Sequence, residues 1–565
     1  MSSNTSARAA LLLFLASAAA FAQPPLLNPA NYRHYVTTFE ADELAATGKI
    51  YNGEPSSSGQ PAEAAWPWMQ QEIPFFDSPD KATEEMYYFR WYAFKKHVVD
   101  TPTGYVITEW LPKPNFPNPE HPDGSYGALV DAAPFHLGEA RWLHTEAIAE
   151  DDARFWYKPD VPGSPNIRKY SAAMATAVRA VTLANGDRSL ATSLLPQLTR
   201  VYHDWETAQQ DSNGLFWSID TRDAMEKSIS GDGYRPTLNS YMVSDARAIA
   251  ATALLARNQQ LANEYTAKAD KLNRLIETVL WNPRDQFYEV VSPAKDSGIR
   301  AEKKFIDPGT ILKLAGVREL IGYNPWNFSS PAPSHAVAWN QLFDPQGFDG
   351  KYGATTAERR SPRFRFVSSD QCTWNGPAWP FAMTQTLNAM AAYLDSPGSH
   401  TIDFKDYRLL FSRYVLAQHI HLPNGRLIDW IDEDYDADTD EWIAKDMLLQ
   451  KHKQVGRGNY YNHSGFADPL ITGLIGLRPR ADDTIEITPA IDPKAWPWFA
   501  IDALPYHHHL LTIAWDSTGH RYHRGQGLSI AVDGKVIARR ATLGHLSAAL
   551  PHSVQPAGED VDPRN

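Results

Sequence analysis

The feature that most constrains this fold is a series of long segments in which apolar and small residues recur at helical spacing. Loops dense in Gly, Pro, Asp and Asn separate them. Some are apolar or small around most of their circumference, as in residues 246–255, and a helix of that kind has to be buried on more than one side. The segments cover residues 83–97, 170–184, 189–209, 240–257, 261–280, 378–394 and 404–419.

These segments follow one another in sequential pairs, and no strands alternate with them convincingly. A helix that is apolar on several faces needs other helices around it, so paired helices over such a length favour an all-helical toroid over an α/β barrel. We therefore predict a mainly α fold in which residues 81–478 form an (α/α)6 barrel of six helical hairpins.

The two ends of the chain have a different texture. Residues 23–80 are rich in Pro, Ser, Gly and Trp and show weak periodicity, which predicts an irregular segment around the main body. Residues 479–565 contain short alternating apolar runs, which predict a small β-sandwich domain. Asp533 and Gly534 lie between two such runs and predict a hairpin turn.

The first 22 residues predict a signal peptide. Arg8 precedes an apolar run over residues 9–20, and an A-x-A pattern ends at Ala22, where we expect cleavage. A membrane span needs roughly 20 apolar residues, which neither this run nor any later stretch supplies. The sequence therefore predicts a periplasmic or secreted protein that does not span a membrane.

Composition excludes several classes of partner and cofactor. A formal net charge of -13 disfavours nucleic acid, which selects basic surfaces. The single cysteine, Cys372, excludes an intramolecular disulfide and a cysteine-based metal cluster. The sequence also lacks a Gly-rich phosphate loop and a His-Glu-x-x-His pattern, so we predict no metal and no organic cofactor.

Two acidic loops could carry glycosidic hydrolysis, which needs one carboxyl group as proton donor and another to activate water or attack carbon. The first, over residues 214–239, contains Asp223, Glu226 and Asp232 together with Arg235 and Asn239. Its apolar neighbours are typical of a half-buried setting that keeps a carboxyl protonated near neutral pH. A solvated surface loop is the alternative reading of such a stretch.

The second acidic loop, over residues 425–442, contains Glu433 among many aspartates but lacks the EF-hand spacing for calcium. Between the two loops, Trp374 and Trp379 flank an Asn-Gly-Pro stretch at the start of an apolar helix. Their rings predict either a wall on which a sugar stacks or ordinary core packing.

These motifs resemble those of the mannosylglycerate-hydrolase-like and trehalase-like inverting glycoside hydrolases, the clan that includes glycoside hydrolase families 37 and 63. The stretch from Asp223 to Ser228 is similar to the Ser-Gly-Met-Asp-Asn-Ser motif that carries the general acid, which places Glu226 at the acid position. Glutamate replaces aspartate there, and Asp223 and Asp232 remain alternatives. The stretch after Glu433 is similar to Glu-Asn-Tyr-Asn-Pro-x-Thr, whose glutamate is the general base.

Other motifs extend the resemblance to the sugar pocket. The run from Trp374 to Trp379 resembles Trp-x-Gly-Pro-x-Trp, residues 351–360 are similar to a pocket loop, and residues 458–466 precede the last barrel helix. The resemblance and the loop chemistry together predict substrate contacts from Asp223, Asp232, Arg235, Asn239, Glu358, Arg359, Trp374, Asn375, Gly376, Trp379 and His463.

The resemblance implies an exported glycoside hydrolase that inverts configuration and acts on an oligosaccharide or a small glycoside, with Glu226 as acid and Glu433 as base. Two alternatives stay open: a polysaccharide lyase on the same barrel, and a carbohydrate-binding protein without catalysis. A carbohydrate is the expected partner. The sequence predicts no particular oligomeric state.

Overall fold

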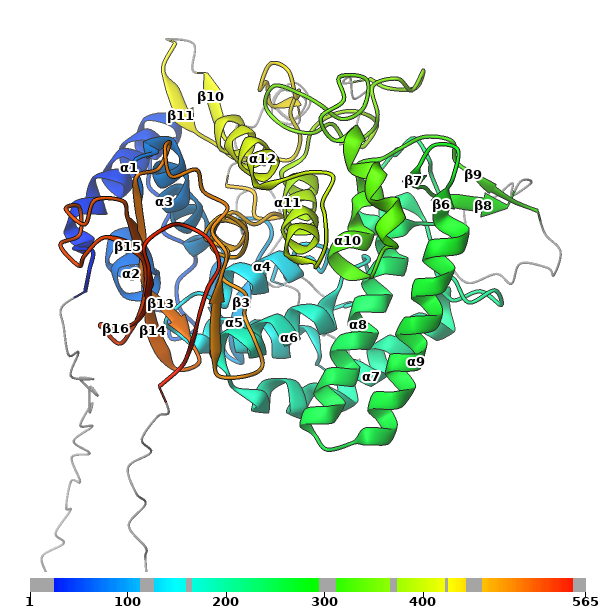
Figure 1. The fold of residues 1–565 in the computed structure, drawn as a ribbon, viewed down its shortest axis with the longest axis horizontal. Helices are drawn as coiled ribbons and strands as arrows, with labels where there is room; N and C mark the ends of the chain where they lie inside the picture. The colour runs from blue at the N-terminus through cyan, green and yellow to red at the C-terminus, as the bar shows by residue number, and fades with distance from the viewer. Residues whose placement is uncertain are drawn as a thin grey trace, which may run out of the picture.

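The computed structural model describes residues 25–111, 126–158, 165–293, 311–365, 373–421, 425–443 and 460–551, so the predicted signal peptide and Cys372 lie outside the described residues. Helices contain most of the residues in the described elements (Figure 1), and the α-helices are long where the strands are short. They are α1 (Arg33–Thr47), α2 (Ala65–Glu72), α3 (Lys81–Lys95), α4 (Ala133–Ala140), α5 (Glu146–Trp156), α6 (Met174–Asn185), α7 (Arg188–Gln209), α8 (Pro236–Leu255), α9 (Gln259–Leu275), α10 (Asn324–Phe328), α11 (Pro380–Asp395) and α12 (Phe404–Ala417).

Every segment with helical spacing contains a helix, which confirms that part of the sequence analysis. Local signals set several ends. Gly186 stops α6 in the left-handed region at φ 77°, and Asp403 begins α12 with a capping box completed by Asp406. A short π-helix over Ile276–Leu280 continues α9, so the predicted segment 261–280 is helical throughout, with a change of pitch near its end.

The helices pack in a series around a common centre (Figure 1). α6 contacts α4, α7 and α8, α8 contacts α9 and α10, and α10 contacts α11. α12 then packs against both α11 and α3. Arg90 of α3 donates from Nε to Oε2 of Glu139 in α4 over 3.0 Å, which links the two ends of the series. The helix-rich body of paired helices agrees with the predicted class, and closure into six regular hairpins stays a prediction.

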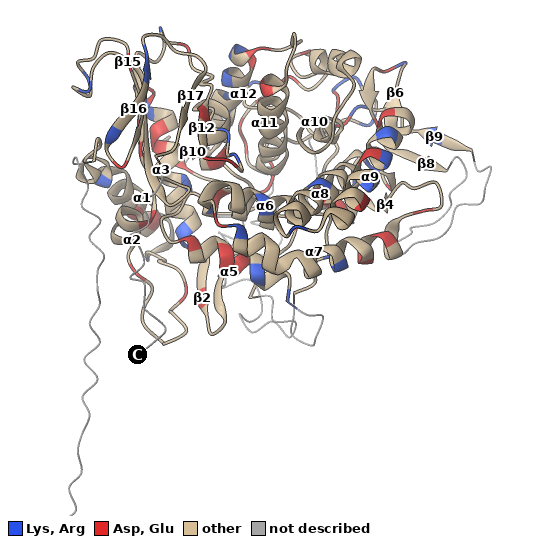
Figure 2. Ribbon diagram, turned by 60° about the horizontal axis from the view of Figure 1, so that its bottom comes forward, with Lys and Arg blue, Asp and Glu red and all other residues tan. Residues whose placement is uncertain are grey.

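Burial separates the central helices from the peripheral ones. α11 buries twelve of its sixteen residues, whereas α9 buries Ala262, Tyr265, Ala269 and Leu272 and leaves its other face to solvent. Charged side chains are spread along α7 and α9, and α11 carries almost none (Figure 2). The central helices are therefore held by apolar contacts on several sides.

The prediction of an irregular segment over residues 23–80 is wrong. This part of the chain contains a 3-10 helix over Pro29–Tyr32, α1, α2 and the strand β1 (Phe75–Asp77). α1 buries Tyr35, Val36 and Phe39 against α3. The periodicity was weak because α1 has a single narrow apolar stripe, and tertiary contact with α3 rather than local preference stabilises it.

A small β region follows the helical body (Figure 1). Its five-stranded antiparallel sheet has the order β1, β13 (Trp498–Tyr506), β14 (His509–Asp516), β15 (Gly527–Val532) and β16 (Lys535–Arg540). β12 (Thr484–Ile487) pairs with β17 (Leu546–Ala549). Asp533 and Gly534 have φ values of 48° and 80° between paired Val532 and Lys535, which confirms the predicted hairpin turn.

Short strands pair in several loops around the helical body (Figure 1). β2 (Val98–Thr101) pairs with β3 (Gly104–Ile107), and β10 (His419–His421) pairs with β11 (Leu427–Asp429). β4 (Trp217–Ser218), β5 (Gly233–Tyr234), β8 (Val291–Pro293) and β9 (Leu312–Leu314) form a small sheet, and β6 (Trp281–Asn282) pairs with β7 (Phe287–Tyr288). Within the described ranges, no helix combines the length and apolar composition needed to cross a membrane.

Candidate active site

The loop that carries Glu226 is closed at its base by β4 and β5, where Trp217 pairs with Tyr234. Inside the loop, the fully buried Arg235 donates from Nε to Oδ2 of Asp223 over 2.6 Å. Oδ1 of Asp223 accepts from the Ser218 hydroxyl at 3.0 Å. Both carboxylate oxygens of Asp223 are thus used in hydrogen bonds inside the protein.

Two further side chains hold the same loop. Asn239 accepts from the Phe216 amide at 2.9 Å and donates to the carbonyls of Phe216 and Arg235, each over 2.9 Å. Its amide hydrogens are therefore committed inside the protein. Glu319, which the sequence analysis missed, accepts from the Ile229 amide at 2.7 Å and from the Ser230 hydroxyl. Arg235 and Asn239, predicted to hold a sugar, thus position the loop instead.

Backbone hydrogen bonds join the two acidic loops through the tryptophan run between them. The Trp374 amide donates to the Glu226 carbonyl over 3.1 Å. Four residues later, Ala378 and Tyr435 exchange amide-to-carbonyl bonds of 2.9 and 3.0 Å. Tyr435 is two residues from Glu433. The structure therefore joins the three motifs that the sequence places far apart.

The electrostatics of Glu226 suit a proton donor. Burial raises its pKa to about 7, the negative charges of Asp131 and Glu433 add to this effect, and an interaction with its own backbone opposes it. Glu433 is buried. A carboxyl group with a pKa near 7, close to a second acid whose charge influences it, keeps a proton to donate near neutral pH and suits the role of a general acid.

Four residues near this pair were missed by the sequence analysis: Glu109, Asp131, Tyr170 and Tyr461. Burial raises the pKa of both tyrosines, and the charges of Glu109 and Asp131 add to this effect. Burial raises the pKa of Asp131 to about 6 and raises that of Glu109 well above its ordinary value. The sequence marks the two acids only by their aromatic or apolar neighbours. That pattern is common wherever a buried strand ends, so it does not indicate a site.

Aromatic rings form one wall of this cluster. Trp374 and Trp379 are stacked with ring centroids 4.6 Å apart and an interplanar angle of 19°. The His463 ring lies 6.0 Å from Trp379 and is stacked on Tyr461 at 4.0 Å. Burial keeps the pKa of His463 well below its ordinary value, so the ring is neutral. The predicted tryptophan wall and His463 are therefore in one place, beside the acids.

The remaining predicted contacts have partners or backbone roles within the protein. Glu358 accepts from Arg318 Nη1 at 2.7 Å, and Arg359 forms two bonds of 2.8 Å to Asp438 of the second acidic loop. Gly376 has a φ of 153°, and a Cβ there would lie 2.7 Å from the Arg365 carbonyl oxygen, so its role is backbone geometry. Asp232 accepts from the Asp220 amide at 3.0 Å.

Two polar atoms of the tryptophan run are buried without a hydrogen-bond partner among the described residues. They are Nε1 of Trp374 and Oδ1 of Asn375. By contrast, Trp379 donates from Nε1 to the Thr373 carbonyl over 3.0 Å. A sugar hydroxyl can satisfy an indole donor and an amide acceptor, so these two atoms fit the predicted role in substrate binding better than the committed side chains do.

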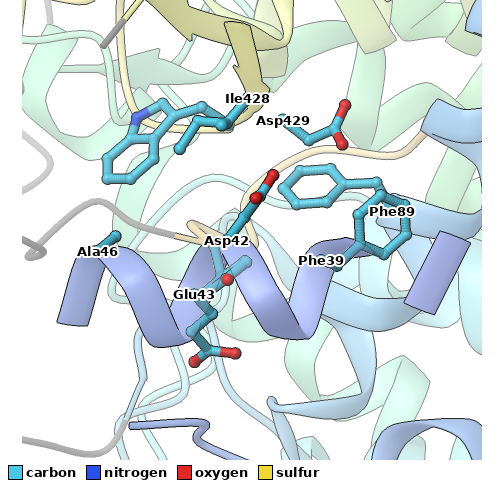
Figure 3. Close-up of a pocket in the computed structure, with 9 residues that line it drawn as sticks. Phe39, Asp42, Glu43, Ala46, Phe89, Ile428 and Asp429 are labelled. Carbon is cyan, nitrogen blue, oxygen red and sulfur yellow. The ribbon is translucent and has the colours of Figure 1, made fainter. Parts of the chain in front are cut away.

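A separate small hollow lies between α1, α3 and β11 (Figure 3). Asp42, Asp429, Phe39 and Phe89 are among the residues that line it. Burial raises the pKa of Asp429 to about 8. Within the described parts of the chain, no set of three or more His, Cys, Asp and Glu side chains has an arrangement that could hold a metal ion.

Comparison with known proteins identifies the family of this chain. The model of the mannosylglycerate hydrolase MGH1-like glycoside hydrolase domain matches residues 125–464, more than half of the chain. The chain belongs to this MGH1-like glycoside hydrolase family. The resemblance inferred from the motifs is thereby confirmed. A second match, to the C-terminal domain of glycosyl hydrolase family 65, covers residues 477–539.

Solved structures share the architecture of this MGH1-like protein. One named as a sialidase is 37% identical with a TM-score of 0.80, and the alignment covers 92% of this chain and 45% of that one. The chain thus spans less than half the length of that relative. A rhamnosidase of glycoside hydrolase family 78 from Bacillus sp. GL1 is 14% identical with a TM-score of 0.50, over 85% of this chain and 43% of that one.

A mannosylglycerate hydrolase of glycoside hydrolase family 63 from Thermus thermophilus, determined with glucose, is 14% identical with a TM-score of 0.42. The alignment covers 60% of this chain and 91% of that one.

Proposed function

We propose that this protein hydrolyses a glycosidic bond with inversion of configuration, with Glu226 as general acid and Glu433 as general base. One observation supports this most: Glu226, with a pKa raised to about 7, is joined through Trp374 and the Ala378–Tyr435 bridge to the loop of Glu433. Family membership supports the reaction class.

In the proposed reaction, the protonated Glu226 carboxyl donates its proton to the departing glycosidic oxygen. The ionised Glu433 removes a proton from a water molecule, which attacks the anomeric carbon from the opposite face of the ring. This single displacement requires a carboxyl separation of roughly 6.5–9.5 Å, whereas retention requires roughly 5–5.5 Å. The stacked Trp374 and Trp379 offer a flat apolar surface for the sugar.

The Arg235–Asp223 ion pair has a positioning role in this mechanism. It is buried within the loop that carries Glu226, and Glu319 anchors the next turn of the loop. A proton donor must lie within hydrogen-bond reach of the leaving oxygen, so a rigid loop shortens the search for the reactive geometry. Because Arg235 uses its donors inside the loop, its positive charge pairs with Asp223 and not with the Glu226 carboxyl group.

The sharpest test is the configuration of the first product. Oligosaccharides, aryl glycosides and mannosylglycerate, for which the family is named, would be screened and the fresh product followed by proton NMR. We expect the anomer opposite to that of the substrate. Formation of the same anomer would contradict inversion of configuration, although the protein would still be a glycoside hydrolase.

Two other outcomes would point to the alternative functions. Unsaturated products that persist in Glu226→Gln and Glu433→Gln variants would indicate a lyase. Sugar binding without turnover in the wild-type protein would indicate a carbohydrate-binding protein. Neither alternative gains support from the site, since a lyase does not need an acid whose pKa is raised beside a second carboxyl group.

We also propose export to the periplasm or the medium, on the basis of residues 1–22. Expression of the full chain in a bacterium, followed by N-terminal sequencing of the mature protein, tests this. A mature N-terminus at Gln23 is expected, and an uncleaved cytoplasmic product would contradict it.

A further inference from the structure

A cavity of about 150 Å³ lies inside the series of packed helices, apart from the acids of the candidate active site. Its lining comes from α4, α6, α10 and α11 and from the turn before the π-helix over Pro469–Leu474 (Figure 1). The lining of α11 begins at Thr384, more than one turn into the helix, whereas Trp379 precedes the same helix. The cavity therefore lies deeper among the helices than the tryptophan wall.

Phe135 lines the cavity and is connected by ring contacts to the tryptophan wall. Its ring meets that of Phe381 edge-on, with centroids 5.0 Å apart. Phe381 in turn lies 5.9 Å from Trp374 and 6.1 Å from His463. These last three residues are not among the described residues that line the cavity. The cavity is therefore a compartment of its own, one layer of rings away from the candidate active site.

Two asparagine side chains of the lining are not used inside the protein. Asn327 of α10 and Asn388 of α11 are half-buried, and no hydrogen bond joins either side-chain amide to another described residue. Each amide offers two donors and one acceptor. Polar groups inside a folded body are ordinarily hydrogen-bonded, so these two amides are met by water or by a ligand that both donates and accepts.

The charged groups among the described residues of the lining are paired with each other. Arg141 donates from Nη2 to Oδ1 of Asp468 over 2.6 Å, and Trp142 donates from Nε1 to the same oxygen over 2.8 Å. Oδ2 of Asp468 accepts no hydrogen bond from the described residues. Because this ion pair is neutral as a whole, an ionic ligand would lose its hydration without gaining a free counter-charge. The lining therefore favours an uncharged ligand.

The rest of the lining is mostly apolar. It includes the rings of Phe135 and Phe328 and the small side chains of Ala173, Ala177 and Ala180. Apolar walls with a few convergent polar groups are typical of small-molecule sites between helices. A cavity of roughly 150 Å³ can hold a molecule as large as benzene. The ligand that fits is therefore small, with C–H groups for the rings and hydroxyl groups for the amides.

From these contacts we propose that the cavity is a second binding site, separate from the candidate active site, which binds a small uncharged polyol such as erythritol. The hydroxyl groups of the polyol bind Asn327, Asn388 and Oδ2 of Asp468, and its C–H groups pack against Phe135 and Phe328. The inference does not depend on the proposed function, because neither of the proposed catalytic glutamates lines this cavity.

Calorimetric titration of the full chain with erythritol and with glycerol tests the proposal without any need for turnover. Both polyols should bind the wild-type protein, whereas lactate and choline, which carry a charge, should give no heat of binding. Asn327→Ala and Asn388→Ala should each weaken erythritol binding about fivefold, since each removes one hydrogen-bonding group from the ligand.

A third variant, Gly138→Ala, tests the space in the cavity while keeping both amides. A Cβ at residue 138 would lie 3.5 Å from Oδ2 of Asp468, which is an ordinary contact, so the backbone can accept it. The added methyl group takes room from the ligand. Erythritol binding should therefore weaken more than glycerol binding in this variant.

The matched control is Asn263→Ala, an asparagine on the exposed face of α9, which should leave the affinity for erythritol unchanged. Glu226→Gln should also leave it unchanged, and a loss of binding there would show that the polyol occupies the candidate active site instead. No heat with erythritol would show that the cavity holds only water. Either result would overturn the proposal, as would unchanged affinity in Asn327→Ala, Asn388→Ala and Gly138→Ala. A protein that binds erythritol as expected but hydrolyses no glycoside would contradict the proposed function alone.

Discussion

Two groups of buried acids in this protein have opposite surroundings. Glu139 accepts from Arg90 at 3.0 Å and from the amides of Phe466 and Asp468, each at 2.9 Å. Asp223 is paired with Arg235 in the same manner. Glu109 and Glu226, by contrast, have acids as their strongest described electrostatic neighbours apart from burial itself. Burial raises the pKa of Glu139 as well, but Arg90 and the Asp468 amide oppose that shift.

The difference separates structural carboxylates from functional ones. A guanidinium group and backbone amides that meet the oxygens of an acid stabilise its ionised form, and the acid then holds two segments together. When an acid is buried among other acids, its ionised form is destabilised. Such an arrangement is typical of sites where the proton of the acid, or an oxygen that accepts a hydrogen bond, takes part in function. The two groups should therefore respond differently to the same substitution.

The largest expected effect is on turnover. Glu226→Gln and Glu433→Gln should each lower kcat by about 10²–10⁴-fold, because each removes a group that moves a proton in the transition state. Their melting temperatures should stay within a few degrees of the wild type. The measurement is steady-state kinetics alongside calorimetry.

The matched control for those variants is Glu139→Gln, which should lose about 3 kcal/mol of unfolding free energy, since it breaks a buried ion pair. Its kcat per folded molecule should change by only a few fold. If Glu139→Gln were as inactive as Glu226→Gln while remaining folded, the separation into two groups would fail.

The next effect concerns the Arg235–Asp223 ion pair in the loop that carries Glu226. Arg235→Met should lower the unfolding free energy by about 3–5 kcal/mol, because Asp223 would stay buried without its cation. The double variant Arg235→Met, Asp223→Asn should recover part of that loss, since it removes the uncompensated charge. Urea titration measures both, and a double variant less stable than the single one would show that Asp223 is not the source of the effect.

The pH dependence of turnover should sharpen the comparison further. The acid must be protonated in the free enzyme, so kcat/KM should fall about tenfold per unit as the pH rises above the Glu226 pKa of about 7. Asp131→Asn should move this limb to lower pH, because the charge of Asp131 helps to raise that pKa. If the alkaline limb of the profile had the same midpoint in Asp131→Asn as in the wild type, the effect of Asp131 on the pKa of Glu226 would be contradicted.

The smallest effect is on stability against pH. Because the pKa of Glu226 is raised on folding, its contribution to stability is complete below its ordinary pKa and is lost as the pH rises through about 7. Glu226→Gln should therefore gain about 1–3 kcal/mol over the wild type at pH 8.5, and nothing at pH 4. Urea midpoints at the two pH values measure this, and equal gains at both would point to a cause other than ionisation.

Sequence pattern predicted the main helices because their apolar faces are broad. The run over residues 246–255 has so few polar residues that only a buried helix fits it, and α8 and α11 appear where expected. α1 was missed because its burial depends on α3, which lies beyond the Pro- and Gly-rich residues 53–62. The strand β1 was missed for a similar reason, since its partner β13 is more than 400 residues away.

The candidate site was predictable only where a motif marked it. Glu226, Glu433 and the two tryptophans were found through their neighbours in sequence, and the structure links their segments by backbone hydrogen bonds. Glu109 and Asp131 have no such signature, because their proximity to the site comes from contacts with residues more than 300 positions away or from shared electrostatics. Arg235 and Asn239 were expected to bind the sugar, and only their bonds show that they serve the loop.

The most direct test of the account is the distance between two carboxyl groups. An experimental structure of the wild-type protein with a non-hydrolysable substrate analogue would give the separation of Glu226 and Glu433 across the sugar. We predict about 6.5–9.5 Å, with one ordered water molecule between Glu433 and the anomeric carbon. A separation near 5 Å, or a sugar bound where only one of the two glutamates faces it, would contradict the mechanism.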